Sequence, residues 1–123
     1  MPTILVIEDE PQMRRNILTI LEMEGYVAHG AENGRLGLEL VQRERPDLVL
    51  CDIMMPELDG YSVLQALRAD AATSNLPFVF LTAKGEKAEL RTGMNLGADD
   101  YLTKPVVVED LLAAVRVRLR PRV

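Results

Sequence analysis

Polar and charged side chains follow several apolar segments of the chain, and their types could support metal and phosphoryl chemistry. Glu8 and Asp9 follow the first apolar segment, and Asp52, Thr82 and Lys104 follow three later ones. Carboxylates gathered in one place would repel one another and raise one another's pKa. Mg²⁺ removes that cost because it prefers oxygen ligands. A lysine and a hydroxyl opposite the acids suit a second anion, such as a phosphoryl group on a nucleophilic Asp52.

These groups can meet only if the apolar segments are neighbouring parallel strands. Short apolar runs predict strands at residues 3–7, 26–29, 47–51, 77–81 and 100–103. Between and after them, helical spacing predicts helices from Pro11 to Gly25, over 33–45, around 63–67, over 86–96 and over 108–119. This alternation implies right-handed crossovers and a parallel sheet, hence an α/β fold built as a three-layer (βα)5 sandwich. Sites in such folds lie beyond the carboxyl ends of the strands.

Composition narrows the class of protein. The 123 residues fit one domain, which we expect to span 1–123, and 48% of them are hydrophobic. A net charge of −5 argues against a basic nucleic-acid surface. The single cysteine, Cys51, fits a reducing compartment and is expected in the core. No apolar run approaches the roughly 20 residues of a membrane span, and the start of the chain lacks signal-peptide features. We therefore expect a cytoplasmic protein.

Four motifs carry a family resemblance. They are ILVIEDEP (4–11), DLVLCDIMMPELDG (47–60), FLTAKG (80–85) and GADDYLTKP (97–105). In this order, and at the predicted strand ends, they resemble the receiver domains of two-component response regulators, the CheY-like family. The resemblance covers essentially the whole chain. It implies a doubly wound five-stranded sheet with the flavodoxin-like order 2-1-3-4-5.

The resemblance also implies a phosphoacceptor and a metal site. Asp52 takes the place of the phosphoacceptor. Asp9 is implied as a direct Mg²⁺ ligand and Glu8 as a ligand through water, with Asp52 and the backbone carbonyl of Met54 completing the set. Mn²⁺ could substitute for Mg²⁺. Glu8 departs from the commoner pair of aspartates but keeps the charge.

Further positions match the part of the family that binds and responds to the phosphoryl group. Thr82 is implied as the switch hydroxyl, Lys104 as the ion-pairing cation and Tyr101 as the switch aromatic. The bond before Pro105 matches a peptide that is typically cis in the family.

Two positions are implied to tune how long the phosphoryl group persists. Met54 and Lys84 lie two residues after Asp52 and Thr82. In the family, such positions control the access and alignment of the attacking water.

The implied function is that of a switch, not an enzyme. A sensor histidine kinase would donate a phosphoryl group to Asp52 in a Mg²⁺-dependent reaction, and hydrolysis would reset the domain. Its own chemistry would be limited to self-phosphorylation from a donor and autodephosphorylation. The surface formed by the predicted helix 86–96, strand 100–103 and helix 108–119 would change and so control an effector protein or fused domain. A phosphorylation-dependent homodimer is one possible output. Direct nucleic-acid binding by this domain and a membrane partner are not expected.

Three alternative functions fit the sequence less well. A phosphatase or phosphotransferase using Asp52 as nucleophile needs a second acid two residues later, where Met54 stands. A nucleotide or flavin site lacks a glycine-rich phosphate loop, and the acids at 8–10 would repel a phosphate. A receiver used only for binding is disfavoured by Asp52, Thr82 and Lys104. His29, the single histidine, is expected to be structural.

Overall fold

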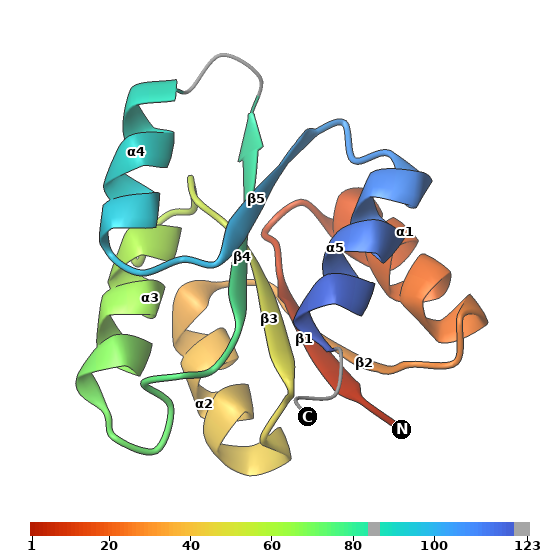
Figure 1. Ribbon diagram of the computed structural model, residues 1–123, viewed down its shortest axis with the longest axis horizontal. Coiled ribbons are helices and arrows are strands. Elements are labelled where there is room, and N and C mark those ends of the chain that lie inside the picture. The colour runs from red at the N-terminus through yellow and green to blue at the C-terminus, as the bar shows by residue number, and fades with distance from the viewer. Residues whose placement is uncertain (84–86, 120–123) are drawn as a thin grey trace.

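Five parallel strands form one sheet with helices on both faces in the computed structural model of the chain (Figure 1). The structure describes residues 1–83 and 87–119, apart from the side chains of 87–90. The strands are β1 Thr3–Ile7, β2 Val27–Ala31, β3 Leu48–Asp52, β4 Phe78–Ala83 and β5 Asp100–Lys104. The helices are α1 Pro11–Met23, α2 Gly34–Glu44, α3 Gly60–Ala69, α4 Lys87–Asn95 and α5 Val108–Arg118. Within these residues, no helix is long and apolar enough to cross a membrane.

The strand order is β2-β1-β3-β4-β5, which confirms the predicted α/β fold and its topology. All four pairings are parallel, so the carboxyl ends of the strands lie at one edge of the sheet. The register pairs Ile7 with Cys51 and Asp52 with Leu81. The ends of β1, β3 and β4 therefore meet where the predicted site residues stand.

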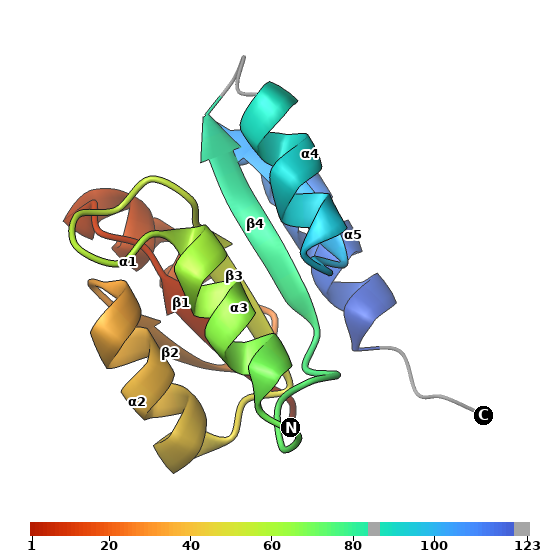
Figure 2. The ribbon, with the colours of Figure 1, turned by 90° about the vertical axis from the view of Figure 1, so that its left-hand side faces the viewer.

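Alternate residues of each strand point to opposite faces of the sheet, and helices cover and bury both faces (Figures 1 and 2). Helices α2, α3 and α4 cover one face and α1 and α5 the other (Figures 1 and 2). The first layer packs strand residues such as Ile7 and Phe80 against Val41 of α2 and Leu64 of α3. The second layer is built around the following residues: Ile4, Val6, Ile17, Leu21, Leu50, Val79, Leu81, Leu111 and Val115. Burial on both faces explains why the central strands β1, β3 and β4 appear in the sequence as continuous apolar runs.

Acceptor side chains cap three of the helices at the edge that carries the site. Glu10 accepts hydrogen bonds from Gln12 N at 3.1 Å and Met13 N at 2.6 Å, with Pro11 opening α1. Asn33 and Asp59 cap α2 and α3 in the same way. Such caps satisfy amide groups that have no partner within the helix. They fix where each helix begins relative to the strand before it.

The bounds of β2, β3, β4 and β5 differ by one or two residues from the sequence-based expectation. β2 runs over Val27–Ala31 instead of 26–29, because Gly30 and Ala31 pair with Val6 and Ile7 of β1. β3 includes Asp52, because the ladder with β4 continues to that residue. In both cases the backbone pairing outweighs the poor strand propensity of glycine and aspartate.

Arg68, at the end of α3, ties together three segments at the opposite edge of the sheet. Its guanidinium donates to the carbonyl oxygens of Leu76 at 2.8 Å and Gly97 at 3.0 Å. It also lies 3.5 Å from Asp99, whose carboxylate accepts a hydrogen bond from Phe78 N. The loops that enter β4 and β5 are therefore held by one side chain.

Gly60, the first residue of α3, lies against the backbone at the end of β3. A Cβ atom there would collide with the carbonyl oxygen of Asp52 and lie 2.9 Å from Ile53 Cα. Gly60 N also donates to Ile53 O at 2.8 Å. Only a residue without a side chain lets α3 begin this close to the strand that carries Asp52.

We predict that Gly60→Ala lowers the free energy of unfolding by about 1–3 kcal/mol, because a rigid backbone must shift to accept the added methyl group. Chemical denaturation would measure the loss. The control is Gln65→Ala, which places alanine at an exposed position of the same helix. Equal stability of the two variants would contradict the close approach at Gly60.

Candidate functional site

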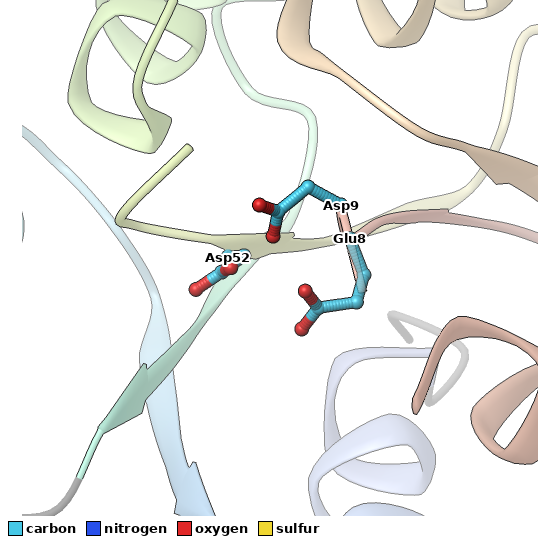
Figure 3. Close-up of side chains that lie close together, drawn as sticks. All are labelled: Glu8, Asp9 and Asp52. Atoms are coloured by element: carbon cyan, nitrogen blue, oxygen red, sulfur yellow. The ribbon is translucent and has the colours of Figure 1, made fainter. Parts of the chain in front are cut away.

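Three carboxylates converge at the carboxyl edge of the sheet. Glu8 and Asp9 follow β1, and Asp52 ends β3. One oxygen from each lies within 4.8 Å of the others, and Figure 3 shows the three side chains directing these groups into one space. Glu8 is 0% exposed and Asp52 is 5% exposed. The acids that the sequence analysis assigned to one site are therefore adjacent, and two of them are buried.

Lys104, at the end of β5, supplies positive charge to this cluster. Its Nζ lies 2.8 Å from Glu8 Oε1 and 3.0 Å from Asp52 Oδ1. Within the described residues, Glu8 Oε1 has no hydrogen-bond partner of good geometry, so its contact with Lys104 is an ion pair. One ammonium therefore serves two buried carboxylates, while Asp9 adds a third negative charge.

Local backbone contacts fix the Glu8 side chain and its peptide. Glu8 Oε2 accepts a hydrogen bond from Glu10 N at 3.1 Å. Glu8 N donates to Ala31 O at 3.0 Å, which extends the pairing of β1 with β2 by one residue. The main chain of Glu8 is thus anchored to a neighbouring strand before the chain turns into α1.

Burial is the main influence on the pKa of Asp52. Burial, together with the Glu8 carboxylate, raises the pKa of Asp52 from 3.8 to about 7, and Lys104 opposes this shift. Burial by itself would lower the pKa of Lys104, but its contacts with Glu8 and Asp52 outweigh that effect and raise it. Burial also raises the pKa of the Cys51 thiol, with Asp52 adding to the shift. Cys51 lies in the core as predicted and is held in its unreactive thiol form.

The donor set fits Mg²⁺. Carboxylate oxygens are hard ligands of the kind this cation prefers, and a few of them suffice because Mg²⁺ keeps several waters. Three carboxylates face one ammonium, and a divalent cation would correct this imbalance. Glu8, Asp9 and Asp52 could hold the ion.

The remaining predicted residues surround the acids to different degrees. Thr82 is buried on β4, one residue beyond the strand partner of Asp52. The Lys104–Pro105 peptide bond is cis. Met54 is 62% exposed in the loop after β3, and Tyr101 is 41% exposed on β5. Lys84 lies outside the described residues.

With this geometry in place, comparison with known proteins identifies the family. The model of the family described as "Response regulator receiver domain" matches residues 4–116. The chain belongs to the response regulator receiver domain family. A receiver domain is a signalling switch, and this one is the receiver of a response regulator.

Curated relatives share more than two fifths of their aligned residues with this receiver domain. The DNA-binding dual master transcriptional regulator RpaA of Synechocystis is 44% identical over 120 residues, which are 98% of this chain and 50% of that protein. Response regulator MprA of Mycolicibacterium vanbaalenii is 42% identical over 117 residues, 95% of this chain and 50% of that protein. The chain thus spans about half the length of these relatives.

Solved structures share the fold of this receiver domain along almost all of its length. A response regulator receiver domain protein from Clostridium thermocellum has a TM-score of 0.90 at 30% identity, covering 97% of this chain and 94% of that one. Chemotaxis response regulator CheY4 of Vibrio cholerae has a TM-score of 0.90 at 28% identity, covering 97% of this chain and 99% of that one. The arrangement of strands and helices is that of CheY-like receivers.

Sequence reasoning missed two contacts within the receiver site. The ion pair between Lys104 and Glu8 was not foreseen, because Lys104 was assigned only to Asp52 and the phosphoryl group. Arg14 of α1 donates from Nη1 to the carbonyl oxygen of Glu8 at 2.7 Å. Its position one helical turn after Glu10 was the available signal. His29 is remote from the acids, on β2, where it contacts Glu44 at 3.7 Å.

We predict that Asp52→Asn stabilises the metal-free protein at high pH. A raised pKa means that the folded protein binds more protons than the unfolded chain between pH 3.8 and about 7. Wild-type stability therefore falls as pH rises through that window. The amide of the Asp52→Asn variant does not titrate, so the variant does not lose this stability. The gain should be about 1–2 kcal/mol near pH 8 and smaller near pH 5. Denaturant titration with a chelator present measures it.

The matched control for this pH effect is Glu57→Gln, which makes the same chemical change at an exposed acid in the loop after β3. Its effect on stability should be small, because this side chain is exposed. A gain for Asp52→Asn that grows toward acid pH would contradict the raised pKa.

Proposed function

We propose that this receiver domain accepts a phosphoryl group on Asp52 from the phosphohistidine of a sensor histidine kinase. The observation that best supports this proposal is the environment of the buried Asp52 carboxylate. Lys104 Nζ lies 3.0 Å from it, and two further acids lie beside it. That arrangement offers a nucleophile, a cation for phosphoryl oxygens and a ligand set for Mg²⁺. The family match supports the proposal.

The chain's own residues have distinct tasks in the proposed transfer. Lys104 holds Oδ1 of Asp52, so Oδ2 is the oxygen that we assign to attack phosphorus. A bond forms from this oxygen to phosphorus, while the bond from phosphorus to the donor imidazole nitrogen breaks and leaves its electron pair on nitrogen. Bound Mg²⁺, held by Glu8, Asp9, Asp52 and the Met54 carbonyl, would neutralise charge gathered around the phosphoryl oxygens. The product is an acyl phosphate on Asp52.

The proposed switch uses residues that lie beside or beyond Asp52. The dianionic group would draw the Thr82 hydroxyl and the Lys104 ammonium toward its oxygens. Tyr101, now 41% exposed, would turn inward as Thr82 moves. The surface of α4, β5 and α5 would change as a result, which is a two-state response to a local charge.

The partners in this proposal are the kinase that phosphorylates Asp52 and an effector that recognises the changed surface. The effector could be a separate protein or a fused domain, because the matched relatives are about twice as long as this chain. A phosphorylation-dependent homodimer is one form the output could take. The expectation that this domain itself avoids nucleic acid finds no support in the comparisons, since RpaA is named as DNA-binding.

A phosphatase or phosphotransferase remains the less favoured function. It would need an acid two residues after Asp52 to protonate a leaving group, and Met54 stands there with an exposed thioether side chain. No described feature favours turnover of an external phosphate ester.

We predict that acetyl phosphate with Mg²⁺ adds one phosphoryl group to the wild-type domain and none to Asp52→Asn. Intact mass spectrometry would detect the addition. The control is Glu57→Gln, which changes an exposed acid of the same loop and should leave phosphorylation intact. Modification that persists in Asp52→Asn would refute the assigned phosphoacceptor.

The same experiment separates acceptance of the group from the response to it. Thr82→Ala should still be phosphorylated, or still bind beryllofluoride, because the nucleophile is unchanged. The NMR signals of Tyr101 should then stay at their unmodified positions. A wild-type Tyr101 shift in Thr82→Ala would show that Thr82 is not the switch hydroxyl.

We predict that substitutions of Met54 and Lys84 change the lifetime of the acyl phosphate severalfold while leaving its formation intact. Met54 is exposed beside Asp52, so its side chain can restrict the approach of water. Following dephosphorylation of Met54→Ala and Lys84→Ala after removal of the donor would measure this. Decay rates equal to the wild-type rate in both variants would refute the role.

A further inference from the structure

Arg14 makes a contact that the proposed chemistry does not use. Its Nη1 donates to the carbonyl oxygen of Glu8 at 2.7 Å, a hydrogen bond strengthened by the charge of the guanidinium. That carbonyl belongs to the peptide joining Glu8 to Asp9. The orientation of this peptide decides where the two acidic side chains leave the backbone.

Gly30 of β2 leaves the space for this contact. A Cβ atom at position 30 would lie 2.9 Å from Leu18 Cδ1 and 3.2 Å from Arg14 Cδ. The stem of Arg14 therefore lies close over the β2 backbone, which directs the guanidinium toward the end of β1. Arg14 is half-buried, in contrast to its exposed neighbour Arg15.

The other groups of Glu8 are already held by different partners. Its amide donates to Ala31, one carboxylate oxygen accepts from Glu10 N, and the other pairs with Lys104. In the described part of the chain, Arg14 is the side chain that holds the Glu8 carbonyl oxygen. Removing it would free the Glu8–Asp9 peptide to rotate while α1 and β1 stay in place.

We infer that Arg14 is a positioning residue for the cation site: it holds the Glu8–Asp9 peptide so that both carboxylates face Asp52. The inference rests on the proposed function, since it concerns the same acids and Mg²⁺. Groups that orient metal ligands typically alter metal affinity by about one to two orders of magnitude when they are removed.

The sign of the effect distinguishes positioning from simple electrostatics. A nearby positive charge repels a cation. If Arg14 acted only through its charge, removing that charge would therefore tighten Mg²⁺ binding. Losing an orienting hydrogen bond would weaken it. Arg14→Met is the informative variant, because it keeps an apolar stem over Gly30 and loses only the guanidinium.

The test is an NMR titration of each variant with Mg²⁺ alone, without a phosphoryl donor. Arg14→Met should bind Mg²⁺ about tenfold more weakly than the wild type. Arg14→Lys should recover most of the loss, because an ammonium can donate to the same carbonyl. Arg15→Met removes the same charge from an adjacent position that has no hydrogen bond or ion pair among the described residues, so it should bind as the wild type or slightly tighter.

Equal Mg²⁺ affinity in Arg14→Met and Arg15→Met would overturn the inference. Thermal unfolding of the same samples covers a purely structural role: a lower melting temperature with unchanged Mg²⁺ affinity in Arg14→Met would also overturn it. If Arg14→Met does not fold, wild-type affinity in Arg14→Ala or a tenfold loss in Arg14→Lys would count against it. Failure of the wild type to bind Mg²⁺ would instead refute the metal in the proposed function, and the inference with it.

Discussion

The ion pairs of Lys104 are the interaction on which the site depends. Two carboxylates at the carboxyl edge, Glu8 and Asp52, are buried, and burial of charge is costly unless it is compensated. The cation that compensates them, Lys104, comes from β5. One strand, β4, lies between β5 and β3, and two strands, β3 and β4, lie between β5 and β1. Neighbouring strands lie about 4.8 Å apart, so only a long side chain can cover this span. Correct assembly of the sheet is therefore required before the acids are compensated at all.

The compensation is incomplete, and the proposed chemistry would follow from that. One ammonium faces three carboxylates. Burial, with the Glu8 carboxylate adding to it, raises the pKa of Asp52 to about 7 even though Lys104 opposes the shift. A cluster balanced by a second lysine would be more stable but would have little tendency to attract a divalent cation. The proposed metal and phosphoryl group would each change the net charge of the site. Because a charge shift in a buried site has large energetic consequences, small ligands can alter the surrounding structure.

Much of the fold could be predicted from the sequence, because alternating apolar runs and helical periodicity reflect local physics. The start of α1 at Pro11 was evident from residue types, whereas the choice of Glu10 over Asp9 as its cap was decided only by the structure. The inclusion of Asp52 in β3 was not, since strand length there is decided by pairing with β4. The convergence of the acids followed from topology.

Individual side-chain contacts in the site were beyond such reasoning. The hydrogen bond from Arg14 depends on how closely α1 packs over Gly30, which no local pattern encodes. Likewise, Glu8 was expected only to keep the charge of the commoner aspartate, whereas in the structure its longer side chain brings the carboxylate to Lys104. Packing distances of a few ångströms decide both contacts.

The contacts of Arg68 show that the two edges of the sheet have different roles. Its bonds to Leu76 and Gly97, and its pairing with Asp99, lie at the amino ends of β4 and β5, far from the acids. Burial lowers the pKa of this guanidinium, and Asp99 opposes the shift, so positive charge there has a local counterpart. Substitutions at the two edges should therefore be harmful for different reasons. At the Arg68 edge they should lower the amount of folded protein, and at the other edge they should impair signalling.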